Sequence, residues 1–242
     1  MKPMKSPDIA LRPGESIDAI SDGRLRVIQS VHGYRFSADA LLLAEFVTIK
    51  PGDTVVDLGT GCGIIPLLLL EKKVPSYVYG LEIQRELASQ SSRNVALNRY
   101  QDRAAVILGD IRQPPFKPSS ADVVVCNPPY RKKESGRVNP NPQRAIARHE
   151  MLAAIDDILE ASRKLLRVPG RLAMIYPAER IVDVFVKMGG FDLEPKRMEI
   201  IYPGPQSEGK RALIEAYVMG GKGLELLPPR FDNGHLTIPR PT

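Results

Sequence analysis

The sequence has no tryptophan, only six phenylalanines and eight tyrosines, and just two cysteines among 242 residues. A core must therefore come from aliphatic side chains, and two cysteines are too few for a disulfide framework or a zinc site. The longest apolar run, Ile64–Leu70, is far shorter than the ~20 residues of a membrane span, and no secretory signal is visible. We therefore expect a cytoplasmic protein with reduced thiols, no metal and no membrane contact.

Charge of one sign is in excess: the net charge is +6, within an ordinary globular composition of 43% hydrophobic and 26% charged residues. Most of this excess lies between residues 131 and 149, where six basic residues face one acid, Glu134. A solvated loop is the ordinary explanation of such a stretch, but its position after the last motif below favours contact with a polyanion. The basic residues are Arg131, Lys132, Lys133, Arg137, Arg144 and Arg148, of which the first four are our candidate RNA contacts.

The pattern of elements divides the chain into three parts. Residues 1–50 predict a hairpin, from strands at 16–20 and 25–30 around Asp22-Gly23, and a helix at 38–47. Residues 51–220 alternate apolar strands with helices, and residues 221–242 form a proline-rich tail. Strands are expected at 54–58, 77–81, 104–108, 122–126, 171–176, 191 onward and 212–219, with helices at 64–72, 84–98, 151–166 and 178–188. Apolar strands that alternate with helices predict a mainly parallel, seven-stranded α/β sheet covered on both faces.

The first motif is Asp-Leu-Gly-Thr-Gly-Cys-Gly at residues 57–63, between a strand and a helix. Glycines at this corner, such as Gly59 and Gly61, let the backbone approach a ligand. The motif has no Lys-Ser/Thr for a phosphate loop, and its third glycine comes one residue early for a dinucleotide fingerprint. An acid at Asp57 instead suits a ligand with a positive ammonium group, as in the methionine part of S-adenosylmethionine. A plain strand-to-helix turn is the alternative.

Two more acids end the next two predicted strands. Glu82 follows the glycine turn at the spacing where an acid binds ribose hydroxyls, and Ile83 beside it can contact an adenine face. Asp110 can accept the adenine amino group, with Ile111 on the other ring face. Each alone is most simply a solvated or turn acid. Three acids at the carboxyl ends of successive strands favour a nucleoside site.

The last motif, Asn127-Pro128-Pro129-Tyr130, follows the valine-rich strand. An exocyclic amine is a poor nucleophile because its lone pair is delocalised into the ring. The Asn127 side-chain oxygen and the Pro128 carbonyl can accept its two N–H groups and favour a pyramidal nitrogen, which is catalysis by positioning. Tyr130 can stack on a flipped base. A proline turn that merely ends a strand is the alternative.

At these motifs, between about Val31 and Tyr217, the sequence resembles the class I S-adenosylmethionine-dependent methyltransferases with an Asn-Pro-Pro-Tyr site. The segments Gly33–Ala44 and Gly209–Ala216 resemble the bacterial tRNA(Val) adenine-N6 methyltransferase group. The resemblance implies a Rossmann-like class I fold, S-adenosylmethionine as cofactor, and methylation of the adenine beside the anticodon. With the interpretations above, the candidate cofactor-binding residues are Phe36, Asp39, Asp57, Gly59, Gly61, Glu82, Ile83, Asp110, Ile111 and Asn127, and the candidate catalytic residues are Asn127, Pro128 and Tyr130. For Asp39, a favourable place in the first turn of a helix explains the residue equally well.

Several substrates share this chemistry, because glutamine amides and the guanine amino group also have delocalised lone pairs. Release-factor glutamine-N5 methyltransferases carry the same tetrapeptide but also a separate N-terminal helical domain, for which residues 1–56 offer only a hairpin and one helix. An rRNA guanine-N2 methyltransferase, a DNA adenine methyltransferase and an RNA-binding protein that keeps the donor fold without activity are further alternatives. We expect structured RNA, most of all tRNA, as partner, and no obligate protein partner.

Overall fold

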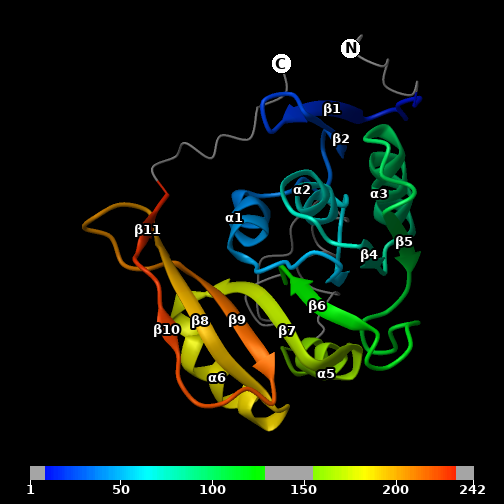
Figure 1. Cartoon of the computed structure of the whole chain (residues 1–242). Helices are drawn as coiled ribbons and strands as arrows, with labels where there is room; N and C mark the ends of the chain where they lie inside the picture. The colour runs from blue at the N-terminus through cyan, green and yellow to red at the C-terminus, as the bar shows by residue number, and fades with distance from the viewer. Residues whose placement is uncertain (1–8, 129–154, 233–242) are drawn as a thin grey trace, which may run out of the picture.

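The computed structural model describes residues 9–128 and 155–232 (Figure 1). It begins with a hairpin of β1 (Glu15–Ile20) and β2 (Leu25–Ser30), followed by the helix α1 (Ala38–Phe46). Ile20 pairs with Leu25, and backbone φ angles between 52° and 81° at Ser21, Asp22 and Gly23 close the turn. The predicted hairpin and first helix are confirmed.

Strands and helices then alternate as predicted. Their bounds are β3 (Thr54–Leu58), α2 (Ile64–Lys72), β4 (Tyr77–Glu82), α3 (Arg85–Leu97), β5 (Ala104–Leu108), β6 (Ala121–Cys126), α5 (Ile155–Leu165), β7 (Leu166–Pro177), α6 (Ile181–Gly190), β8 (Leu193–Tyr202) and β9 (Arg211–Val218). The seven long strands lie in the order β8-β9-β7-β6-β3-β4-β5, and only β9 runs antiparallel to its neighbours among them. This mainly parallel, Rossmann-like sheet confirms the predicted fold class.

Both faces of the sheet are covered, and the valine-rich strand β6 shows why its sequence is apolar throughout. Val123 and Val125 belong to one core, with side chains of α1 and α2, whereas Val124 and Cys126 belong to a second core, with side chains of α5. In Figure 1, α1, α2 and α3 lie on one side of the sheet and α5 and α6 on the other. Among the helices in the described part of the chain, none is long and apolar enough to cross a membrane.

The strand β7 begins five residues before the predicted strand at 171–176. Leu166 already pairs with Ala121, and the register of β6 and β7 shifts before Arg171 pairs with Val123. Pro169-Gly170 therefore lies inside a strand, at an irregularity of its pairing. Proline is tolerated there because a bulged residue needs no ladder hydrogen bond.

The predicted C-terminal tail adds two short strands to the sheet. β10 (Glu225–Leu226) and β11 (Arg230–Phe231) both pair in parallel with β8, so the sheet of the described residues has nine strands. Arg230 contacts Glu199 of β8 through two nitrogen–oxygen pairs, at 2.8 and 3.2 Å, and reaches Glu45 of α1 at 2.8 Å. The periodicity of the sequence gives no sign of two-residue strands, because they form only against an existing edge.

Candidate functional site

The glycine turn between β3 and α2 crosses the end of the neighbouring strand β4. The backbone N–H groups of Gly59 and Thr60 both donate to the Leu81 carbonyl, at 2.9 and 3.0 Å. Gly61 and Gly63 have φ angles of 58° and 83°, which other residues rarely adopt. A Cβ on Gly61 would lie 2.8 Å from Cε1 of Tyr34, a ring of the segment between the hairpin and α1. The turn therefore needs glycine for both its conformation and its close contacts.

Two buried carboxyl groups stand behind this turn. Glu82 is 2% exposed, and its two oxygens accept the backbone N–H groups of Gly61 and Gln84, each at 2.9 Å. Asp57 is completely buried, and neither of its oxygens has a hydrogen-bond partner among the described residues. Burial raises the pKa of Asp57 to about 7; the neighbouring Thr60 hydroxyl opposes this shift and the Glu82 carboxylate adds to it. Burial also raises the pKa of Glu82. Of the two acids behind the turn, Glu82 has hydrogen bonds to both carboxylate oxygens and Asp57 has none.

Asp110 and Ile111 lie just after β5, and each already has contacts in this structure. The Asp110 carboxylate accepts the backbone N–H of Arg112 at 2.9 Å and forms an ion pair with its side chain, which lowers the pKa of Asp110. Ile111 is 7% exposed and belongs to the core under the sheet, whereas Ile83 at the end of β4 is 42% exposed. Ile83 is thus open to a planar ligand, while Asp110 already has a partner.

The register of the sheet brings the last motif to the same edge. Leu58 pairs with both Leu81 and Cys126, so Asn127 follows β6 where Gly59 follows β3. Asn127 is partly buried, and Pro128 is buried. Pro129, Tyr130 and the basic residues Arg131, Lys132, Lys133, Arg137, Arg144 and Arg148 lie outside the described residues.

The glycine turn, two buried acids and an Asn-Pro step thus share the carboxyl edge of three neighbouring strands. The family model for the methyltransferase small domain matches residues 35–184 of the sequence. This chain belongs to that methyltransferase family. It is also 30% identical, over 206 residues that cover 82% of the chain and 80% of the relative, to the "tRNA1(Val) (adenine(37)-N6)-methyltransferase" of Porphyromonas gingivalis ATCC 33277.

Other proteins support the same family and fold. An enzyme of that same name from Trichodesmium erythraeum is 30% identical, covering 75% of this methyltransferase and 76% of the relative. Among solved structures, a predicted O-methyltransferase from Agrobacterium tumefaciens aligns with a TM-score of 0.63 at 19% identity, covering 80% and 86% of the two chains. The geranyl diphosphate C-methyltransferase of Streptomyces coelicolor, in complex with S-adenosyl-L-homocysteine, aligns with a TM-score of 0.52 at 14% identity, covering 87% and 94%. These structures share the fold with the methyltransferase described here.

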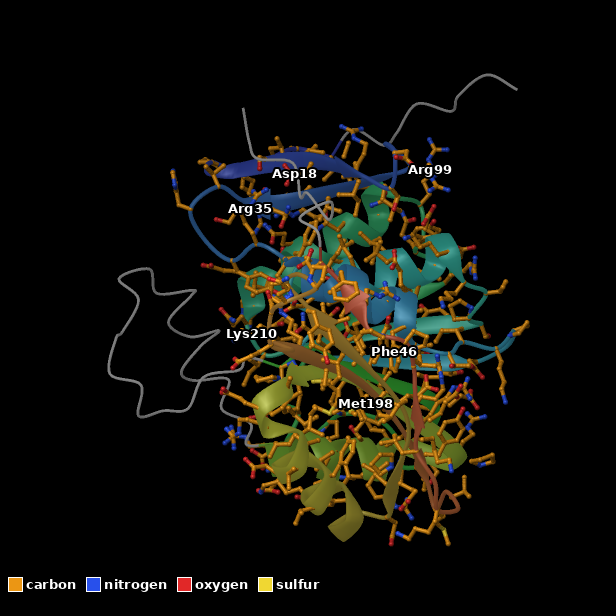
Figure 2. All side chains as sticks on the ribbon, turned by 90° about the vertical axis from the view of Figure 1, so that its left-hand side faces the viewer. Asp18, Arg35, Phe46, Arg99, Met198 and Lys210 are labelled. Atoms are coloured by element: carbon orange, nitrogen blue, oxygen red, sulfur yellow. The ribbon has the colours of Figure 1, made fainter. Side chains whose placement is uncertain are left out.

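The segment between the hairpin and α1, together with the first turn of α1, contains Phe36 and Asp39, two of the candidate cofactor-binding residues of the methyltransferase. Phe36 is buried, and its backbone N–H donates to the side-chain oxygen of Gln29 in β2, at 3.0 Å. Asp39 lies at the start of α1 with one carboxylate oxygen 2.6 Å from Nε of Arg211, so the two segments that resemble the tRNA(Val) group meet in space. Figure 2 shows Arg35 beside Asp18 of β1, with which it forms an ion pair.

Tyr34 is the residue of this segment that sequence reasoning missed. Its ring contacts Gly61, and burial raises its pKa strongly, with Cys62, Glu82, Asp57 and Asp39 adding to the effect. The same burial raises the pKa of Cys62 to about 12, so this thiol stays protonated. The sequence did offer one signal for Tyr34: it lies two residues before Phe36, in the segment Gly33–Ala44 that resembles the tRNA(Val) group.

Proposed function

We propose that this methyltransferase transfers the methyl group of S-adenosylmethionine to N6 of an adenine in tRNA. Two relatives that align with about four fifths of the chain, at about 30% identity, are named for that activity. The observation that carries the proposal is the shared edge of β3, β4 and β6, where the Gly59–Gly63 turn, Glu82 and Asn127-Pro128 follow neighbouring strands. A donor and an acceptor of a methyl group need this proximity.

The residues present fit the donor at three points. The buried Asp57 carboxyl matches the donor's ammonium group. The space beside Gly61 is taken by the Tyr34 ring, so this glycine serves the conformation of the turn. Solvent does not reach Asp57 in this structure, so this contact requires the covering side chains to move apart. Glu82 has further lone pairs for the ribose hydroxyls, and exposed Ile83 suits the adenine face. Asp110 fits less well, because Arg112 must release its carboxylate before it accepts an amino group.

The acceptor amine is held by Asn127 and Pro128. The side-chain oxygen of Asn127 and the carbonyl of Pro128 accept its two N–H groups, which turns the nitrogen lone pair toward the methyl group. Tyr130 stacks on the flipped base. S-adenosylmethionine would supply a methyl group on a positive sulfur, which becomes a neutral thioether when the N–C bond forms. The methylated nitrogen would then release one proton to water, so the residues need no metal ion to assist.

The same proposal extends to the rest of the chain. A methyltransferase domain at 51–220 is flanked by a hairpin and helix at 1–50, which cover the donor side, and by the C-terminal segment 221–242. The basic stretch that starts with Arg131, Lys132, Lys133 and Arg137 holds the phosphates beside the flipped base. The enzyme acts in the cytoplasm and needs no obligate protein partner.

Asn127→Ala tests the acceptor site. We expect methyl transfer to fall about 100-fold or more, since aligned hydrogen bonds contribute on this scale. Affinity for S-adenosylhomocysteine should change far less, because the main contact of Asn127 is to the acceptor amine. Labelled methyl transfer to unmodified tRNA, rRNA and a release factor, followed by nucleoside analysis, measures both activity and substrate. N6-methyladenosine in tRNA is the expected product. Methylguanosine in rRNA or methylglutamine in protein would instead support an alternative above, and an Asn127→Ala variant with parental activity would remove this residue from the mechanism.

The RNA contact is tested separately by replacing Lys132 and Lys133 with alanine. Each phosphate neutralised contributes roughly 0.7–0.9 log units of affinity per log unit of salt. The double variant should therefore bind tRNA more weakly, with a shallower salt dependence and unchanged donor affinity. A matched control replaces Lys187 and Lys222, two lysines that form ion pairs on the α6 and β8 side of the sheet. Parental tRNA affinity and salt slope in the Lys132/Lys133 variant would place the RNA contact elsewhere.

A further inference from the structure

The helix α3 contacts both the hairpin and the glycine turn. These two elements are far apart in sequence and together form what we call the donor side. Asn94 of α3 is completely buried. Its side-chain oxygen accepts the backbone N–H of Ile28 at 2.6 Å, and its amide nitrogen donates to the Ile28 carbonyl at 2.9 Å. The same nitrogen donates to the carbonyl of Cys62 at 2.9 Å. One side chain therefore binds both the hairpin strand β2 and the glycine turn.

The glycine turn is held on this side by α3. Cys62, whose carbonyl Asn94 binds, stands between Gly61 and Gly63, both with positive φ angles. Ser91, one turn before Asn94 on α3, fills the space beside Gly63, where an added Cβ would lie 2.3 Å from its hydroxyl. The direction of the peptide groups in the turn thus depends on a side chain of a different element.

The hairpin in turn positions the segment that closes over the turn. Gln29 follows Ile28 in β2 and is completely buried, with its amide nitrogen 2.6 Å from a carboxylate oxygen of Asp18. Its side-chain oxygen accepts the backbone N–H of Phe36, two residues after the Tyr34 ring that contacts Gly61. Asn94 therefore binds both the glycine turn and β2, the strand that positions the segment 34–36 over that turn.

We propose that Asn94 is a positioning residue for methyl-donor binding, which sets the spacing between the glycine turn and the hairpin segment 34–36. The inference rests on the proposed donor site. It adds a residue that acts through the glycine turn and the hairpin and contacts neither the donor nor the acceptor amine. A displaced turn weakens donor affinity and raises the KM for the donor, but at saturating donor kcat is unchanged, because Asn127 and Pro128 follow a different strand, β6.

The chain offers a matched control in Asn98, one turn further along α3. Its side chain also binds the hairpin twice, through the N–H and the carbonyl of Arg26 at 2.9 and 2.7 Å. Its third hydrogen bond goes to the backbone of its own helix, at Asn94, and not to the glycine turn. Asn94→Ala and Asn98→Ala therefore both loosen the hairpin, but only the first releases the turn.

The experiment measures the Kd of S-adenosylhomocysteine by calorimetry, the KM and kcat for S-adenosylmethionine, and the Tm of each variant. The expected result is a Kd and KM raised about tenfold or more in Asn94→Ala with little change in kcat, and a Kd within about twofold of the parent in Asn98→Ala despite a lower Tm. Binding by the parent protein tests the proposed function; the ratio of variant to parent tests this inference.

Equal effects of the two substitutions on Kd, or parental affinity in Asn94→Ala, would overturn the proposal. Should Asn94→Ala fail to fold, Asn94→Asp keeps the acceptor for the Ile28 N–H and places an oxygen against the carbonyls of Ile28 and Cys62. This second variant should also weaken donor binding about tenfold. Failure of both variants to fold would make Asn94 a determinant of the fold and would overturn its assignment as a positioning residue.

Discussion

At the scale of single residues, Asp57 is the least satisfied group of the site. Its pKa of about 7 exceeds the ordinary value of 3.8, so the folded protein holds a proton that the unfolded chain has released. The free energy of unfolding therefore falls as pH rises between these two values and levels off above them. We expect Asp57→Asn to be more stable than the parent at about pH 8, by on the order of 3 kcal/mol, with a difference that shrinks toward about pH 4.

Thermal unfolding of both proteins at several pH values measures this effect, and calorimetry should show weaker donor binding in the same variant. Asp53→Asn is the control, because Asp53 is also buried but forms an ion pair with Arg171, so its replacement should lower Tm. An Asp57→Asn variant less stable than the parent at about pH 8 would contradict the unfavourable burial of this carboxylate.

At the scale of elements, the start of α2 depends on how closely α3 packs against it. Gly63 is the N-cap of α2 in a left-handed conformation, and an added Cβ would meet the Ser91 hydroxyl at 2.3 Å. Gly63→Ala therefore carries a steric clash in addition to the conformational cost of about 1 kcal/mol. We expect a loss of roughly 2–4 kcal/mol in the free energy of unfolding, measured by urea denaturation.

Gly52→Ala separates the two contributions. Gly52 has a φ of +90° and nothing within 4 Å of an added Cβ, so it should show the conformational cost alone. Combining Gly63→Ala with Ser91→Gly should recover part of the loss, because it removes the clashing hydroxyl. Equal losses at Gly52 and Gly63 would show that α3 does not restrict the turn.

At the scale of the whole molecule, the segment that ends at Asp232 ties the far edge of the sheet to the donor side. Arg230 joins Glu199 to Glu45, and the backbone N–H of Asp232 donates to the Tyr202 carbonyl at 2.7 Å. A chain that stops after Gly221 loses both strands and exposes the edge of β8. We expect its Tm to fall by roughly 5 °C or more, since each 1 kcal/mol shifts Tm by ~2–4 °C at this size.

A chain that stops after Asp232 is the control, because it keeps β10, β11 and both contacts of Arg230. Its Tm should lie clearly above that of the Gly221 truncation. A Gly221 truncation with parental Tm would mean that these strands only rest on the sheet edge.

The sequence by itself determined the alternation of strands and helices, the glycine turn and the edge at which Glu82 and Asn127 would lie. These features depend on short-range causes: apolar strands buried on both faces, glycines at positive φ, and the rule that parallel strands end at one edge. The family resemblance carried the substrate class, which no pattern in the described residues gives.

Only the tertiary structure decided which polar groups are satisfied. Asp57 is left without a partner, Asp110 is paired with Arg112, and Tyr34 covers Gly61, because burial and side-chain direction depend on residues distant in sequence. The double role of Asn94 is of the same kind, since its partners Ile28 and Cys62 precede it by 66 and 32 residues. Hydrogen-bond partners at that separation are set by the packing of α3 against β2 and the turn, which local periodicity does not record.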